Sequence, residues 1–269
     1  MVNPVAFSLF GVSVYWYGII IASAIVIGVW LAMRESRRRG IDPENIIDLC
    51  LWAVPFAVIG GRLFYVIFTW DMFKSEPISI LYIWHGGLAI YGVVIVGVLV
   101  VYLFSRHRKL GFVNMLDILA PSLVLGQAMG RWGNFFNQEA YGSVVTDPSM
   151  QWFPFAVFIE NSGANGAWHL ATFFYESMWC FLVFGFLYWY QKRQKRAGNV
   201  ILWYFLLYGV ERAFVEGLRT DSLWLIPGVV RVSQALSVCF VLAAGALLIY
   251  NNFYRRKPVS ENGTKADNA

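Results

Sequence analysis

Seven apolar segments divide this chain, and they constrain its fold more than any other feature. They cover approximately residues 14–33, 48–68, 88–104, 112–130, 171–190, 200–218 and 231–251. About 18 or more apolar residues in a row are enough for a helix to span the hydrocarbon of a bilayer. Only 14% of the 269 residues are charged, which is well below the share found in soluble domains. The sequence therefore predicts an all-α polytopic membrane protein with seven transmembrane helices.

The distribution of Lys and Arg predicts how these helices are oriented. Most basic residues fall in the connections after the first, third and fifth segments and in the C-terminal tail. These residues are Arg34, Arg37, Arg38, Arg39, Arg106, Arg108, Lys109, Lys192, Arg193, Lys195, Arg196, Arg255, Arg256, Lys257 and Lys265. Such residues concentrate on the cytoplasmic side of membrane proteins. We therefore expect the N-terminus outside and the C-terminus in the cytoplasm. Short basic clusters at helix ends also argue against a nucleic-acid-binding face.

The connections and the tail predict a simple domain organisation. We expect one membrane domain over residues 1–256, with outer connections at 69–87 and 131–170. The polar segment 257–269 is expected to form a disordered cytoplasmic tail. The opening of the chain has neither a positively charged n-region nor a cleavage site, so no cleavable signal peptide is expected. We also expect no metal and no cofactor, because the sequence contains neither a nucleotide-binding glycine loop nor a metal-ligand cluster.

Ionisable residues inside the apolar segments gather toward the predicted outer leaflet. Counted from the helix ends, Arg62, Glu176, Arg212 and Glu216 fall in or near the outer halves of their segments, and Arg131 ends the fourth. Charged groups at membrane depth usually mark a pathway or a reaction site. The pattern predicts one polar cavity that opens outward or laterally. Its arginines favour an anionic ligand, since the planar guanidinium fits phosphate well.

The sixth segment shows a second pattern, because four polar side chains share one helical face. Tyr208, Arg212, Glu216 and Arg219 are spaced i, i+4, i+8 and i+11. A ligand site explains this face, and so does a structural ladder of ion pairs that joins helices.

The run from Gly130 to Glu139 carries the densest group of polar side chains. Here Arg131 could hold a phosphate, while Asn134, Asn137 and Glu139 could bind hydroxyl groups of a lipid headgroup. Asp117 in the fourth segment is ambiguous between a helix-interior hydrogen bond and a site role. His85, followed by two glycines, is a candidate general base or a structural histidine.

Five motifs in order resemble the prolipoprotein diacylglyceryl transferases of bacterial membranes. They are GGRLFYV at 60–66, HGGLAIYG at 85–92, GRWGNFFNQEAYG at 130–142, YES at 175–177 and YGVERAFVEGLRTD at 208–221. The resemblance covers about residues 15–250 and implies a seven-helix inner-membrane fold. It also implies the transfer of a diacylglyceryl group from phosphatidylglycerol to the lipobox cysteine of a prolipoprotein. The chain departs from the family around His169, where the usual His-Pro pair lacks its proline.

The resemblance implies important positions throughout the chain. These are Tyr17, His85, Asp117, Arg131, Asn134, Glu139, Gly142, Tyr208, Arg212, Glu216 and Arg219. We assign Arg131 and Arg212 to a phosphate clamp, supported by Arg219 or Arg62. His85 is the first candidate for the base, with Glu216 second and Tyr17 as a further catalytic residue.

A transporter or flippase for an anionic lipid is the alternative from another functional class. Alternating access needs polar groups on both sides of the membrane. The inner halves of the predicted segments hold few of them, which favours an enzyme whose site faces the outer leaflet of a bacterial plasma membrane.

Overall fold

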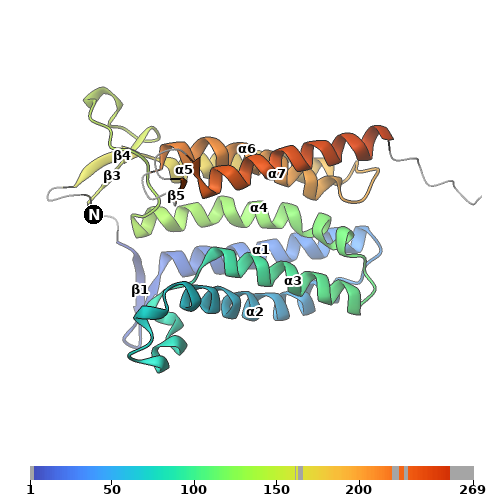
Figure 1. Cartoon of the computed structure of the whole chain (residues 1–269), viewed down its shortest axis with the longest axis horizontal. Coiled ribbons are helices and arrows are strands. Elements are labelled where there is room, and N and C mark those ends of the chain that lie inside the picture. Colours follow the sequence, from blue (N-terminus) through green and yellow to red (C-terminus); the bar gives the residue numbers. More distant parts are fainter. Residues whose placement is uncertain (1–2, 161, 163–165, 220–223, 227–229, 255–269) are drawn as a thin grey trace, which may run out of the picture.

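Long helices form most of this chain. The computed structural model describes residues 3–160, 162, 166–219, 224–226 and 230–254. Within these ranges lie α1 (Trp16–Arg38), α2 (Glu44–Phe68), α3 (Ile90–His107), α4 (Phe112–Asn137), α5 (Thr172–Tyr190), α6 (Asn199–Val215) and α7 (Val232–Ile249). They run roughly side by side along the long axis of the molecule (Figure 1).

Five of the described helices are long and apolar enough to cross a membrane: α1, α2, α3, α4 and α7 with the π-helical turn η6 (Tyr250–Tyr254) that extends it. The other two helices, α5 and α6, are not among these candidates, and α6 has only 17 residues. The prediction of a mostly helical chain is therefore confirmed, and the five candidate spans support a membrane protein. The number of seven spans stays a prediction.

Short strands accompany the helices, and the all-α prediction missed them. Three antiparallel pairs form, β1 (Val5–Leu9) with β2 (Val12–Tyr15), β3 (Ala156–Ile159) with β4 (Ala167–Leu170), and β5 (Trp224–Ile226) with β6 (Val230–Arg231). Figure 1 shows the labelled strands at one end of the helices, which we call the strand end. Short 3-10 helices also occur in the connections: η1 (Trp70–Met72), η2 (Pro77–Leu81), η3 (Ile83–His85), η4 (Pro148–Met150) and η5 (Glu216–Leu218).

Connections rich in Lys and Arg meet at the opposite end, which we call the basic end. The α1–α2, α3–α4 and α5–α6 connections line one common pocket there. Because three connections separated in sequence come together, the charge pattern used to orient the helices corresponds to one physical end of the molecule.

The centre of the bundle is α4. In its most apolar window 44% of residues are buried, against 17–22% in the other four candidate spans. One apolar cluster joins α4 to α5 and α6 through Ala128, Cys180 and Tyr204. A second cluster lies toward the basic end and includes Met115 of α4 with Ile46 of α2. Because both clusters include residues of α4, this helix connects α5 and α6 with α2.

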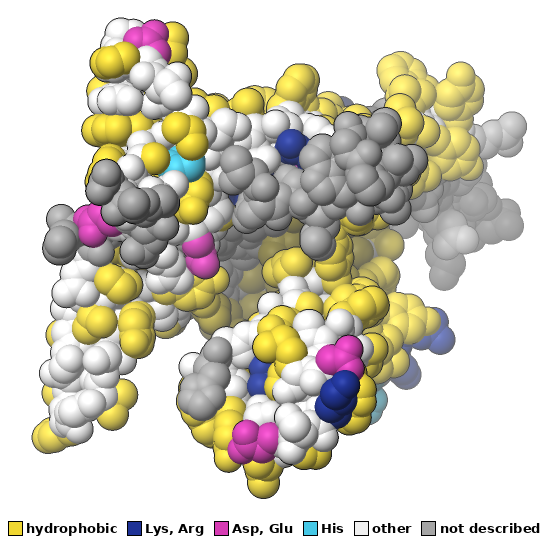
Figure 2. Space-filling view, turned by 60° about the vertical axis from the view of Figure 1, so that its left-hand side comes forward, with side chains coloured by type: hydrophobic (Ala, Val, Ile, Leu, Met, Phe, Trp, Pro, Cys, Tyr) yellow, Lys and Arg dark blue, Asp and Glu magenta, His cyan; other side chains and the backbone are white. Residues whose placement is uncertain are grey.

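Exposed apolar side chains cover the outside of the helices. Val26, Leu51, Ile67, Leu182 and Leu242 are each more than 65% exposed. Figure 2, turned to bring the strand end forward, shows hydrophobic side chains over much of the visible face. A surface this apolar fits lipid as its surroundings.

Several helix ends differ from the expected boundaries, and two of them bear on the site. The fourth segment was expected to end at residue 130, but α4 continues for two more turns to Asn137 and ends at Gln138 in the left-handed conformation (φ 52°). The sixth was expected to reach residue 218, but α6 ends at Val215 and a single 3-10 turn follows. The single helical face predicted through Arg219 is therefore wrong, because Arg219 has an extended backbone (φ −84°, ψ 148°).

Glycines allow α2 and α3 to approach each other closely. A Cβ added at Gly92 would overlap with the carbonyl oxygen of Gly60, and one added at Gly60 would overlap with Val96. Only residues without a side chain fit such a crossing. The glycines of the Gly-Gly-Arg motif at 60–62 therefore serve helix packing.

Asp117, whose role the sequence left ambiguous, caps the start of α6. Its Oδ2 accepts the backbone N–H of Gly198 at 2.6 Å, and its Oδ1 accepts that of Ile201 at 2.9 Å. The side chain is fully buried near the basic end. Asp117 also lies 14 residues before Arg131, which is about 21 Å along the helix. The structure therefore gives Asp117 a structural role, and the substrate-binding role expected for it stays a prediction.

Replacing Asp117 with alanine is expected to lower Tm by roughly 5–10 °C. The change leaves two buried amides at the start of α6 without acceptors, which costs about 2–3 kcal/mol of unfolding free energy. The shift in Tm follows from this cost and the size of the chain. Thermal unfolding of the detergent-purified protein measures the shift. Asp71→Ala is the matched control, because Asp71 is 91% exposed and pairs with Lys74 on the surface. A variant as stable as the control would contradict the capping role.

Candidate active site

The centre of the candidate site is Glu176, a fully buried carboxylate in the second turn of α5. Its Oε2 pairs with Arg131 of α4 and lies 3.3 Å from Nη1 of Arg212 on α6. Its Oε1 lies 3.6 Å from Nη1 of Arg219. One carboxylate thus holds three guanidinium groups from three segments of the chain. We call these four residues, with Glu216, the arginine cluster.

Glu216 completes the cluster from the 3-10 turn after α6. Its Oε2 lies 2.6 Å from Nη2 of Arg212, and only 2% of its side chain is exposed. The three arginines retain 12–18% exposure, whereas the carboxylates behind them retain at most 2%. The cations therefore form the accessible face of the cluster, as a site for an anion requires.

Hydrogen bonds between α4 and α5 position Arg131 opposite Glu176. The hydroxyl of Ser177 donates to the carbonyl of Ala128 at 2.9 Å and accepts the indole N–H of Trp132 at 3.0 Å. These two bonds fix the residues next to Arg131 and Glu176 in each helix. Because these bonds tie α5 to α4 beside the pair, its geometry exists before any ligand arrives.

Arg219 is positioned by the segment that follows α4. Gly142 forms a β-bridge with Arg219, and the amide of Ser143 donates to the carbonyl of Leu218. The Gly142 carbonyl also accepts a hydrogen bond from Nδ1 of buried His169 at 2.7 Å. A Cβ at Gly142 would lie 2.8 Å from Cβ of Leu170, which explains why glycine is needed here. His169 and Gly142 thus act as structural supports for Arg219.

Several expected site residues lie near this cluster in the sequence or in space. Asn134 lies one turn after Arg131 on α4, and Nδ2 of Asn137 donates to Glu139 at 3.2 Å. The ring of Tyr17 packs against Gly133, where a Cβ would lie 2.5 Å from the ring. Tyr208 lies one turn before Arg212 and stacks on Tyr204. The structure thus places Tyr17 beside the polar end of α4.

Arg62 does not join the cluster. Its three nitrogens donate to the carbonyls of Ser79, Ile80, Gly86 and Gly87 at 2.8–3.0 Å, and to that of Tyr82 at 3.5 Å. These five contacts use all five N–H groups of the guanidinium. The structure therefore gives Arg62 a structural role, in which it shapes the connection between α2 and α3, and its expected role as a phosphate ligand stays a prediction.

His85 lies in the connection that Arg62 organises. Its backbone ends η3, and Gly86 and Gly87 follow with positive φ angles of 84° and 77°. The His85 side chain lies outside the described part of the structure. Its role as a base therefore stays a prediction.

Sequence reasoning missed two carboxylates of the site. Glu176 was placed near the outer leaflet but not assigned a role, although a carboxylate within an apolar segment was a usable signal. Glu211 lies in the motif at 208–221 but off the helical face of Tyr208 and Arg212, so the spacing gave it no role. It is 5% exposed, its charge interacts with those of Glu176 and Arg131, and neither of its carboxylate oxygens has a hydrogen-bond partner among the described residues. An unsatisfied buried carboxylate requires an explanation, and a functional site supplies one.

The arrangement suits stabilisation of a developing negative charge. Several guanidinium groups converge in a place shielded from water, where electrostatic interactions are stronger than in solvent. Among the described residues no group of three His, Cys, Asp or Glu is placed to hold a metal ion.

Comparisons with known proteins agree on one family. The sequence profile of the prolipoprotein diacylglyceryl transferases matches residues 4–250. A phosphatidylglycerol–prolipoprotein diacylglyceryl transferase of Listeria monocytogenes is 44% identical over 258 residues, which cover 95% of this chain and 92% of that protein. Proteins of the same name from Pediococcus pentosaceus (45% identity) and Enterococcus faecalis (44% identity) each cover 96% of this chain, with 92% of their own length matched.

Proposed function

The chain belongs to the prolipoprotein diacylglyceryl transferase family, and from that membership we propose how its arginine cluster works. The protein is a membrane transferase that moves a diacylglyceryl group from phosphatidylglycerol to a prolipoprotein. In the proposed reaction the acceptor is the thiol of the lipobox cysteine. The observation that carries the site assignment is the convergence of Arg131, Arg212 and Arg219 on Glu176.

The reaction balances with two bonds exchanged. The thiol loses its proton to a base, and its sulfur forms a thioether bond to the terminal glyceryl carbon of the lipid. The bond between that carbon and the phosphate oxygen breaks, and its electron pair leaves with the oxygen as glycerol phosphate. Negative charge therefore grows on the phosphate. Arginines aimed at this charge bind the transition state more tightly than the ground state.

The expected site residues divide into three roles in this proposal. Arg131 and Arg212 clamp the phosphate, with Arg219 in support. Asn134, Asn137 and Glu139 bind the glycerol of the headgroup. The remaining residues, Tyr17, Gly142, Tyr208 and Glu216, shape the cluster or orient its arginines. Tyr17 remains a catalytic candidate and Glu216 the second candidate for the base.

His85 is proposed as the base that takes the thiol proton. We expect His85→Gln to lower kcat by about 100-fold or more, as loss of a general base does, and to remove the acidic limb of the pH–rate profile. Steady-state rates between pH 5 and 9 test this. An unchanged acidic limb with retained activity would remove His85 from the role. The adjacent variant Trp84→Phe controls for disturbance of the loop.

The orientation of the protein is also proposed. The basic end faces the cytoplasm of a bacterial cell, in keeping with the usual charge asymmetry of membrane proteins. The arginine cluster near the strand end then serves the outer leaflet of the plasma membrane. Seven spans with the N-terminus outside and the C-terminus inside satisfy this charge pattern. Residues 1–256 would form one domain, and the expected tail at 257–269 lies outside the described residues.

Intact-mass spectrometry tests the function directly. A lipobox peptide is incubated with purified protein and phosphatidylglycerol. We expect the mass of one diacylglyceryl group to be added to the peptide, with release of glycerol phosphate and no product from a Cys→Ser peptide. An unmodified peptide from folded protein, across several detergents, would overturn the assignment. The transporter alternative has no support in the comparisons.

A further inference from the structure

The basic end contains a pocket that the transferase reaction does not use. Its volume is about 530 Å³, which lies within the usual range for small-ligand sites. Eleven residues from the three connections at this end line it: Arg38, Arg39, Ile41, Lys109, Leu110, Asn114, Gln191, Gln194, Lys195, Arg196 and Ala197. Five of them are cations and none is a carboxylate. Two carboxylates, Glu35 and Asp117, lie behind this lining, so a net positive charge faces the opening.

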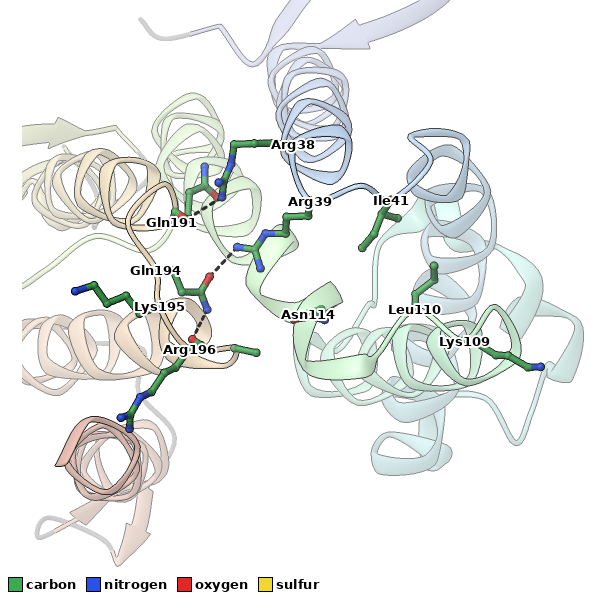
Figure 3. Close-up of a pocket in the computed structure, with 11 residues that line it drawn as sticks. Arg38, Arg39, Ile41, Lys109, Leu110, Asn114, Gln191, Gln194, Lys195 and Arg196 are labelled. Carbon is green, nitrogen blue, oxygen red and sulfur yellow. Dashed lines mark hydrogen bonds between the residues drawn. The ribbon is translucent and has the colours of Figure 1, made fainter. Parts of the chain in front are cut away.

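Arg39 forms the polar floor of the pocket. Figure 3 shows its guanidinium reaching from α1 toward Gln194 of the α5–α6 connection, with Asn114 of α4 near the other side of the opening. Nη2 of Arg39 donates to Oε1 of Gln194 at 2.8 Å, and Nε donates to Glu35 at 2.7 Å. The floor therefore has a fixed geometry, since its guanidinium is held on two sides.

Flexible cations stand at the rim. Lys109 and Lys195 project outward on opposite sides of the pocket (Figure 3), and neither pairs with a carboxylate among the described residues. Their long stems allow the ammonium groups to close over an anion at the opening. The lining also contains unsatisfied polar atoms, because Nη1 of Arg196 and Oε1 of Gln191 are buried without a hydrogen-bond partner in the described chain. Gln191 itself is only 4% exposed.

A second, less polar pocket adjoins this one between α1 and α5. It has a volume of about 310 Å³ and shares Arg38 and Gln191 with the first. Leu31 and Tyr188 extend its lining along the helices, and the charged residues Arg34, Glu35, Arg37 and Lys192 complete it. The pair of pockets thus joins a cationic opening at the helix ends to a groove whose exposed wall is mainly apolar, although charged residues border it. A free anion would occupy the cationic opening alone, whereas a phospholipid would fill both the opening and the groove.

We infer that the basic end binds an anionic phospholipid of the inner leaflet, with its phosphate headgroup in the cationic pocket and an acyl chain along the α1–α5 groove. Basic pockets between transmembrane helices on the cytoplasmic side are suited to such headgroups. The charge asymmetry of membrane topology explains why cations are abundant here, but it requires neither a fixed floor nor an adjoining groove. The bound lipid would join α1, α4 and the α5–α6 connection, and its binding is independent of the transfer reaction.

The test uses the full chain in detergent and a lipid that is not the substrate. Short-chain phosphatidic acid is compared with phosphatidylcholine of the same chains and with inorganic phosphate, by native mass spectrometry and by thermal unfolding. We expect phosphatidic acid to bind and to raise Tm, whereas phosphatidylcholine and inorganic phosphate leave it unchanged. Equal stabilisation by inorganic phosphate would overturn the lipid assignment, and a lack of response to phosphatidic acid would overturn the site.

Matched variants locate the binding. Lys109→Gln with Lys195→Gln removes two rim cations and is expected to weaken phosphatidic acid binding about tenfold. Arg106→Gln with Arg193→Gln removes two charges from neighbouring positions that line neither pocket, and should change binding less than twofold. Asn114→Leu, which alters no charge, should also weaken binding. Equal losses in both double variants would show only diffuse attraction to a basic surface and would contradict the inference. The arginine cluster, at the far end, is the same in all of these proteins.

Discussion

Replacing Arg131 with lysine is expected to lower kcat/KM for diacylglyceryl transfer about 100-fold, and replacing it with glutamine about 1000-fold or more. Lysine keeps the positive charge but loses the planar fork that binds a carboxylate and a phosphate together. Arg131 contacts Glu176 from α4 and retains 17% exposure, so it can hold its carboxylate partner and still face a ligand. The loss should appear mainly in kcat, because the charge being stabilised grows as the leaving group departs.

The measurement is the initial rate of peptide modification at several phosphatidylglycerol concentrations. Arg106→Lys is the control, since Arg106 lies in the last turn of α3 at the basic end and should behave as wild type. Circular dichroism and Tm establish that each variant is folded. Near-normal kcat in Arg131→Lys would exclude bidentate phosphate binding by this residue and would shift the clamp to Arg212 and Arg219.

Replacing Glu176 with alanine is expected to be the most destabilising change in the site. The substitution leaves three guanidinium groups near one another without their shared carboxylate. Removal of one partner from a buried ionic network costs about 3–5 kcal/mol. For a chain of this length the expected decrease in Tm is roughly 10 °C or more.

Phosphatidylglycerol provides a second readout for this variant. Its phosphate can pair with the freed arginines, so the lipid should raise Tm of Glu176→Ala by more than it raises that of the wild type. Glu76→Gln is the control, because Glu76 is an exposed carboxylate in the α2–α3 connection. If Glu176→Ala matched the wild type in Tm, Glu176 would not be the residue that holds the cluster together. If phosphatidylglycerol stabilised both proteins equally, its phosphate would not bind at these arginines.

The helices could be predicted because their signal is local and strong. Apolar runs and the charges between them located seven helices, of which the structure has α1 to α7 in the same order. The two boundaries near the site were missed in opposite directions. Polar residues suggested that the fourth segment ends at residue 130, whereas α4 continues to Asn137. The helical spacing of Arg212 and Glu216 suggested that the sixth segment reaches residue 218, whereas α6 ends at Val215. In space, Asn134 and Asn137 are tolerated on α4 because this end lies beside the polar segments of the strand end. The three short hairpins were missed because strands of two to five residues have little periodicity of their own.

The sequence predicted which residue types form the site better than it predicted which residues contact one another. Arginines in apolar segments were recognisable as unusual, and three of them meet on Glu176. Arg62 carried the same signal, yet its partners are backbone carbonyls of a loop 17–25 residues away, which no side-chain pattern shows. Asp117 likewise caps a helix 81–84 residues later. A buried charge can be identified from sequence, but what satisfies it depends on tertiary structure.

The order in which the cluster's residues occur in the chain has a consequence for biosynthesis. Glu176 follows Arg131 by 45 positions, and Arg212 follows Glu176 by another 36. At about 5–20 residues per second, a ribosome needs several seconds between the first and second of these residues. During that interval the nascent chain has an arginine at the end of α4 with no carboxylate to neutralise it. The insertion machinery, or water at the membrane surface, must accommodate this charge until α5 is synthesised and inserted. Mutations that slow the insertion of α5 should therefore lead to degradation of the chain before they affect catalysis.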